Sequence, residues 1–203
     1  MYGFTEEEIK LLNSINTPKK IQDFLDSLKI NFEENGETCF SPRKVLKLRK
    51  AHCFEGALLA AAALRVNGHR SLIVDLTTAR YDQDHVIAVF KENGYWGAIS
   101  KTNHYMLRYR DPVYKSVREL IMSYFHEYYD DYGNKNLRSY TMPIDLSRYD
   151  KYGWMTSEDD VWYIYKDLFK MPHIKLINKS QAAKLRKSGK LEIDVGKLVE
   201  WKN

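Results

Sequence analysis

The sequence predicts an α+β fold, in which a small antiparallel sheet packs on a central helix that carries Cys53, with further helices on its N-terminal and C-terminal sides. Residues 54–66 are rich in alanine and leucine, which favour a helix with apolar atoms on most of its surface, so that a sheet can cover it closely. Three strand-like segments follow, SLIVDL, DHVIAVF and YWGAIS. The Asn93-Gly94 pair between the last two is typical of a hairpin turn, which predicts that these two strands are antiparallel.

The composition is that of a folded globular chain, with 44% hydrophobic, 29% charged and 13% aromatic residues. A chain of 203 residues is long enough for one or two domains. No repeat or low-complexity linker marks a boundary. We therefore expect one domain over residues 1–203, with a core at 42–111, N-terminal helices within 1–41 and a helical, basic extension at 112–203.

The charge pattern argues against a dedicated polyanion site. The net charge is +5, but the 32 basic residues are interleaved with 27 acidic ones, which favours a mixed solvated surface and makes a nucleic-acid partner a weak hypothesis. The N-terminal MYGFTEEEIK is acidic where a secretory signal is basic, and no apolar run approaches the roughly 18 residues of a membrane span. These features predict a cytoplasmic protein that has no membrane partner.

Helix-start signals recur in the N-terminal part. Thr5 with Glu8 three residues later has capping-box spacing, and Thr17 followed by Pro18 opens the segment IQDFLDSL. A Ser-Pro pair at residues 41–42 can cap a third short helix through RKVLKLRK. We expect three helices before Cys53.

The C-terminal part shows two further helical patterns. Beyond Asp111, VYKSVRELIMSYFHEYY has apolar and aromatic residues at helical spacing, and SEDDVWYIYKDLF predicts a helix capped near Thr156 or Ser157. Between them, GNKNLRSYTMPIDLSRYDKYG reads as irregular, and the basic end of the chain predicts a short helix with an edge strand or a surface tail. An aromatic stripe is expected to form a helix face that packs on the sheet: Tyr124, Phe125, Tyr128 and Tyr129.

Cys53 is the leading candidate for a nucleophile because it lies in the first turn of the alanine-rich helix. The partial positive charge at a helix N-terminus favours thiolate over thiol, and the free backbone N–H groups there can hold an oxyanion. His85, at the head of DHVIAVF, is the candidate base. Pairing Glu92 with Tyr95 through the hairpin turn puts residue 102 opposite His85 and residue 100 on the same face, one pair inward.

The segments HCFEGALLAAAALRVNG and DHVIAVFKENGYWGAIS give a Cys that opens an Ala-rich and Leu-rich helix, a strand, then His at the head of a strand and a Trp-bearing return strand. This order resembles the core of the transglutaminase-like superfamily of papain-type cysteine enzymes, over about residues 51–102. The resemblance implies an α+β fold with a Cys, His and usually Asp triad, in which Cys53 is the nucleophile and His85 the base.

The resemblance places the acid of the triad about four residues after the return-strand Trp, where this sequence has Ser100. A serine can accept a hydrogen bond but cannot stabilise an imidazolium with a charge. Asn103 is our preferred third member, since an amide can orient the ring, with Ser100 or Asp111 as alternatives and His104 as a weaker one.

Two functions follow from these residues. The first is a cysteine-dependent acyl-transfer enzyme that acts on a peptide, amide or ester; hydrolysis and transfer both stay open. The alternative is an inactive module of the same fold that binds a protein or polyanion.

No cofactor is expected. A zinc site from Cys53, His85 and another histidine lacks specific ligand spacing. Cys39 reads as a loop or packing residue that oxidation could pair with Cys53. The other histidines occur in unlike contexts: His52, His69, His104, His126 and His173.

Overall fold

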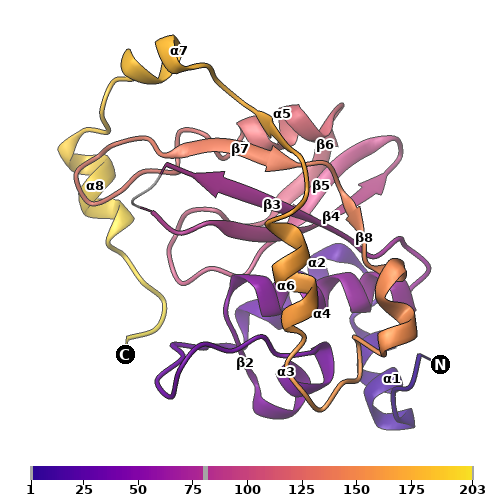
Figure 1. Ribbon diagram of the computed structural model, residues 1–203. Helices are drawn as coiled ribbons and strands as arrows, with labels where there is room; N and C mark the ends of the chain where they lie inside the picture. The colour runs from indigo at the N-terminus through magenta and orange to yellow at the C-terminus, as the bar shows by residue number, and fades with distance from the viewer. Residues whose placement is uncertain (1, 80–81, 203) are drawn as a thin grey trace.

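The computed structural model describes residues 2–79 and 82–202. The fold is α+β, as predicted, and a mainly antiparallel sheet separates two sets of helices (Figure 1). The main sheet has the strand order β6-β5-β4-β3-β7-β9, and β8 pairs with the start of β3. Its strands are β3 (Leu72–Thr78), β4 (His85–Glu92), β5 (Tyr95–Ile99), β6 (Arg110–Tyr114), β7 (Leu137–Thr141), β8 (Ile144–Asp145) and β9 (His173–Lys175). A separate parallel pair joins β1 (Lys29–Ile30) to β2 (Lys50–Ala51).

Three helices precede Cys53 and begin where the sequence signals lie. They are α1 (Glu6–Ser14), α2 (Pro18–Asp26) and α3 (Pro42–Leu48). Thr5 and Glu8 form the capping box of α1, and the side chains of Thr17 and Ser41 accept backbone hydrogen bonds at the starts of α2 and α3. All three helices pack against the next one, α4.

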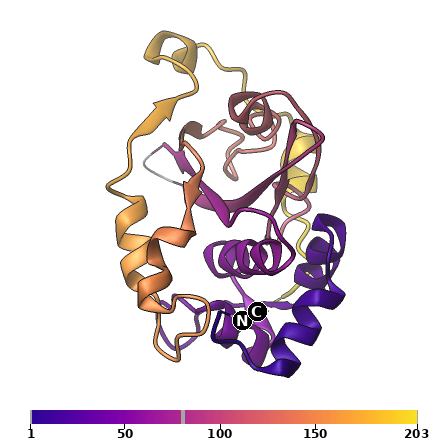
Figure 2. The same ribbon diagram turned by 90° about the vertical axis from the view of Figure 1, so that its right-hand side faces the viewer.

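The central helix α4 (Cys53–Val66) lies under the sheet and packs on β4. In Figure 2 it is seen nearly along its axis, between the N-terminal helices and the orange C-terminal helices. Its residues from Phe54 to Leu64 are all buried, because alanine brings the helix close to its neighbours on every side. Only the two ends of the helix reach solvent, and Cys53 is at the leading end.

The opposite face of the sheet is covered by α5 (Val117–Met122) and the turns that follow it. Three of the four residues of the aromatic stripe pack on the sheet here, since Tyr124, Phe125 and Tyr128 are buried. Tyr129 is half-buried, and its hydroxyl donates to the carbonyl of Glu192 instead. The predicted long helix is wrong in extent, since its start belongs to strand β6 and its end, after Met122, is a run of turns. The stripe keeps its packing because burial, not helical geometry, fixes these side chains.

The C-terminal extension departs most from expectation. The segment predicted to be irregular supplies β7, β8 and a 3-10 helix, η1 (Leu146–Tyr152), so the sheet is larger than the sequence indicated. Helix α6 (Trp162–Leu168) begins later than the caps suggested. The reason is that the preceding residues dock on the N-terminal part instead: the carbonyl of Ser157 accepts a hydrogen bond from Ser41 and Asp160 pairs with Lys44.

The chain ends in two short helices, α7 (Lys179–Ala183) and α8 (Lys190–Gly196), which project beyond the sheet in Figure 1. The last strand, β9, lies before them, and the part of the chain described after Ala183 contains no edge strand. Among the helices described, none has the length and apolar character that a membrane crossing requires.

Candidate active site

A cleft of about 930 Å³ opens at the leading end of α4. His52, Cys53 and His85 line one part of it. The rest is formed by segments at residues 30–33, 82–84, 101–107 and 127–134, together with Ile193 and Gly196 from α8. Its described lining is strongly acidic and includes Lys101 as its one Lys or Arg; the carboxylates are Glu33, Asp82, Asp84, Glu127, Asp130 and Asp131. Anionic reagents are therefore repelled from this cleft.

Cys53 is placed for reactivity by the start of α4. The thiol is half-buried and lies in the first turn, where the helix dipole favours a negative charge. Burial alone would raise the pKa of this thiol, but hydrogen bonds and positive charge from His52 and His85 outweigh burial and lower the pKa well below its ordinary value. These contacts favour the thiolate over the thiol.

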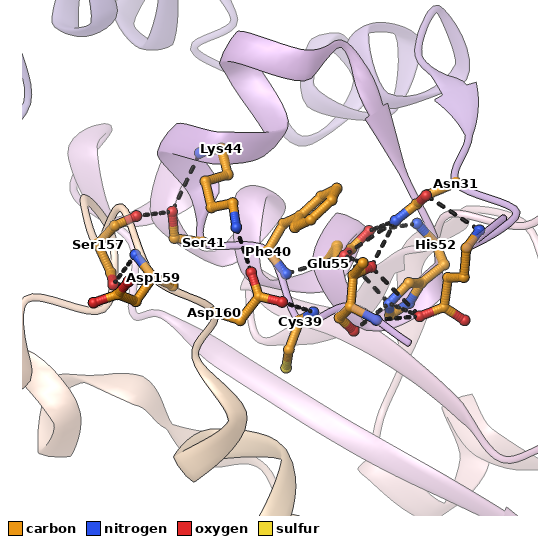
Figure 3. A network of polar contacts seen from close by, with 12 residues as sticks. Asn31, Cys39, Phe40, Ser41, Lys44, His52, Glu55, Ser157, Asp159 and Asp160 are labelled. Atoms are coloured by element: carbon orange, nitrogen blue, oxygen red, sulfur yellow. Dashed lines mark hydrogen bonds and ion pairs between the residues drawn. The ribbon is translucent and has the colours of Figure 1, made fainter. Parts of the chain in front are cut away.

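The other cysteine has the opposite environment. Cys39 is fully buried, and its backbone N–H donates to the Asp160 carboxylate (Figure 3). Burial, with the negative charges of Glu55 and Asp160, raises the pKa of the Cys39 thiol. Both cysteines are free thiols, so the chain carries one activated and one protected sulfur.

His85 begins β4, and the imidazole is nearly buried, with 7% of the residue exposed. The hairpin register is the predicted one, with Glu92 opposite Tyr95. The Nε2 atom of His85 lies 2.8 Å from the hydroxyl oxygen of Ser100. Because Nε2 is engaged by Ser100, Nδ1 is the ring atom left for the Cys53 sulfur.

Ser100 is itself held from the far side by α2. Gln22 donates from its amide nitrogen to the Ser100 carbonyl at 2.9 Å and accepts from the Ser100 N–H at 2.9 Å. The buried Gln22 side chain thus bonds both the carbonyl and the N–H of Ser100, which fixes the position of the Ser100 hydroxyl next to His85. Sequence reasoning did not single out Gln22, and no local pattern marks it.

The structure corrects the preference for Asn103 as the residue that orients His85. The Asn103 amide instead pairs with the backbone of Trp201, donating to its carbonyl at 3.0 Å and accepting from its N–H at 2.8 Å. His104 contacts the carbonyl of Gly196 through Nδ1 at 3.0 Å. Asp111 is an exposed residue of the sheet-edge strand β6 and does not line the cleft. Of the four candidates, Ser100 alone makes the contact at His85.

A second histidine, which sequence reasoning left among scattered residues, lies on the other side of Cys53. The Nε2 atom of His52 is 3.2 Å from the carbonyl oxygen of Thr38 and 3.4 Å from Oε1 of Glu55. Burial would lower the pKa of His52, but its hydrogen bond to Cys53, the Cys53 charge, Glu55 and the Thr38 carbonyl raise this pKa to about 9. The only sequence feature that could have indicated this role of His52 is local: it directly precedes Cys53, and Glu55 follows two residues after the cysteine.

Asp75 is a buried carboxyl on β3, close to the site. It is 3% exposed, and its Oδ2 lies 3.1 Å from Nε2 of His173 on β9. Burial raises the pKa of Asp75 to about 6; the nearby charges of Asp84 and Cys53 also raise it, while the bond to His173 opposes this shift. No sequence pattern indicates this pair, because its two members lie 98 residues apart in the chain.

Within residues 2–79 and 82–202, no three His, Cys, Asp or Glu side chains are grouped so as to hold a metal ion. Comparison of the chain with protein-family models and with curated proteins finds no match. The interpretation of the site therefore depends on its geometry.

Proposed function

We propose that the protein is a cysteine-dependent acyl-transfer enzyme, with Cys53 as nucleophile and His85 as proton carrier. One observation carries the proposal: a thiol at a helix N-terminus, with a lowered pKa, faces a cleft that also holds the candidate base. A strongly shifted pKa in a cleft is a marker of catalytic groups. The resemblance of residues 51–102 to the transglutaminase-like superfamily supports the same assignment.

The reaction has two steps. His85 accepts the Cys53 proton and the thiolate attacks the carbonyl carbon of an amide or ester, with the developing oxyanion next to the first-turn N–H groups of α4. As the bond to the leaving group breaks, that group takes the proton from His85, and an acyl-thioester remains on Cys53. Water or an amine then gives a proton to His85 and attacks the thioester, which releases the acyl group and restores the thiolate.

In this mechanism Ser100 is a positioning residue. Its hydroxyl oxygen accepts a hydrogen bond from the Nε2–H of His85, which leaves Nδ1 free to take the Cys53 proton, and the same bond is kept when the ring is doubly protonated. It adds no negative charge behind His85. Stabilisation of the ionised site must therefore come from elsewhere.

The proposal is tested with p-nitrophenyl acetate, a neutral ester suited to an acidic cleft. We expect fast p-nitrophenolate release and an acetyl group on Cys53, located by mass spectrometry. Both should be lost in Cys53→Ala and His85→Ala and kept in the matched variant Cys39→Ala. Addition of hydroxylamine distinguishes transfer from hydrolysis. Equal ester cleavage by wild type and Cys53→Ala would refute the proposal and leave the non-catalytic binding module as the better hypothesis.

A further inference from the structure

We propose that His52, backed by the buried carboxylate of Glu55, supplies the positive charge that holds Cys53 as a thiolate. This inference depends on the proposed function for its catalytic meaning, but it concerns the resting state of the thiol. It also explains how a site without an acid next to His85 can hold a thiolate and an imidazolium: the carboxylate of Glu55 lies next to His52, the other imidazole.

The first support is the position of Glu55. This side chain is fully buried, two residues after Cys53 in the first turn of α4. Its Oε2 accepts from the His52 N–H at 3.0 Å, and its Oε1 accepts from the Phe40 N–H at 3.0 Å and from the Thr38 hydroxyl at 2.7 Å. Asn31 adds amide contacts at 3.1 and 3.3 Å (Figure 3). A buried carboxylate with this many donors is a fixed negative charge.

The second support is the orientation of His52. The residue is the N-cap of α4, so its backbone is fixed by the start of the helix. Its Nε2 faces the Thr38 carbonyl at 3.2 Å, and a carbonyl oxygen can only accept, so this nitrogen carries a proton. The Nδ1 atom then remains for Cys53. A proton on both nitrogens lets the ring bond Thr38, Glu55 and the thiolate together.

The third support is the balance of charge. With Cys53 as thiolate and its proton on His85, the group of four ionised residues is Cys53, His85, His52 and Glu55, two negative and two positive. Removal of His52 leaves the half-buried thiolate and the buried Glu55 carboxylate as two negative charges beside one imidazolium, which is unfavourable. The His52–Glu55 pair stays charged through the reaction, while His85 exchanges its proton.

Other titratable groups also act on this site. Apart from Glu33 and Glu55, which are replaced in variants below, they are common to every variant tested. The titratable groups around the Cys53 sulfur and the His52 ring are Glu33, Glu55, Asp75, Asp82, Asp84, His85, Lys101, Tyr128 and Tyr165. Most carry negative charge, which disfavours a thiolate. The positive charge of His52 adds to that of His85 in offsetting them.

The test is the pH dependence of Cys53 alkylation by iodoacetamide, a neutral reagent, followed by mass spectrometry. An unactivated thiol has a pKa near ~8.5 and is roughly 0.3% ionised at pH 6. We expect His52→Asn, which keeps a favourable N-cap, to react at least about tenfold more slowly than wild type at pH 6 and at a similar rate at pH 9. His52→Gln serves as a second variant should the first fold poorly.

The matched control is Glu33→Gln, because Glu33 also lies near His52, at 3.6 Å from Nε2, but is partly exposed. We expect Glu33→Gln to change the pH 6 rate less than about threefold, since water screens an exposed charge. Glu55→Gln should slow the pH 6 reaction in the same direction as His52→Asn. A wild-type rate at pH 6 in folded His52→Asn and His52→Gln would overturn the inference.

The two proposals fail in different ways. Alkylation needs no acyl substrate, so a His52-dependent thiolate without any ester turnover would support this inference and refute the proposed function. Ester turnover that requires Cys53 and His85, with alkylation at pH 6 unchanged by His52→Asn, would support the function and refute this inference.

Discussion

Replacement of Ser100 by Ala tests whether a neutral hydrogen bond orients His85. The variant removes the oxygen that lies 2.8 Å from His85 Nε2 and leaves the backbone bonds to Gln22 in place. When the imidazole of His85 is neutral, this hydrogen bond joins two uncharged groups and contributes about 0.5–1.5 kcal/mol. At about 1.4 kcal/mol per tenfold change, kcat/KM for ester cleavage should fall roughly 2- to 13-fold. A carboxylate in the place of the Ser100 hydroxyl would contribute about 1.5–3 kcal/mol, so removing a carboxylate would lower kcat/KM by more than removing the hydroxyl does.

The assay is p-nitrophenyl acetate cleavage across pH 6 to 9, with nitrogen NMR of the His85 ring as the readout of its tautomer. Ser71→Ala is the matched control, since Ser71 is an equally buried serine of the same sheet region, 1% exposed, with its hydroxyl near Asp145 and not near His85. The control should leave kcat/KM within about twofold. An unchanged kcat/KM in Ser100→Ala, or a loss above about 100-fold without unfolding, would contradict the role assigned to Ser100.

Three other predictions follow from burial and packing. In native protein, iodoacetamide should label Cys53 at neutral pH while Cys39 stays unlabelled until unfolding, as read by mass spectrometry; equal labelling would contradict the environments described. Gly56→Ala should lower the free energy of unfolding in urea, because a Cβ at this position would lie 2.5 Å from the Cβ of Lys101. Overpacking costs about 1–3 kcal/mol, which exceeds the roughly 1 kcal/mol that alanine gains in helix propensity. A higher free energy of unfolding would show that α4 can shift to make room. Asp75 has a folded-state pKa of about 6, above its unfolded value, so its contribution to stability is present below pH ~4 and is lost as the pH rises through 6. In urea titrations from pH 4 to 7, wild type should therefore lose roughly 2–3 kcal/mol of unfolding free energy that Asp75→Asn does not lose. Parallel stability curves for the two proteins would exclude a raised pKa of Asp75 as the cause.

The sequence by itself determined the features that depend on neighbouring residues. Thr5, Thr17 and Ser41 fix the starts of three helices because a cap bonds to an N–H only three residues ahead. The Asn93-Gly94 turn fixes the hairpin register because both residues adopt positive φ, as such a turn requires. The register in turn gave residue 100 as a neighbour of His85. The fold class and the place of Cys53 at the leading end of α4 followed from the same local patterns.

The tertiary structure decided which groups meet around Cys53. The choice of Ser100 over Asn103 depended on Trp201, which lies 98 residues after Asn103 and takes both of its amide bonds. Against the effect of burial, the pKa of His52 is raised first by Cys53 and then by Glu55 and the carbonyl of Thr38, which a loop brings to the start of α4. A pKa depends on every charge and on the burial within several ångströms, and the sequence order of distant segments does not encode those distances. The candidate nucleophile was therefore readable from the chain, while the contacts that lower its pKa were readable only from the fold.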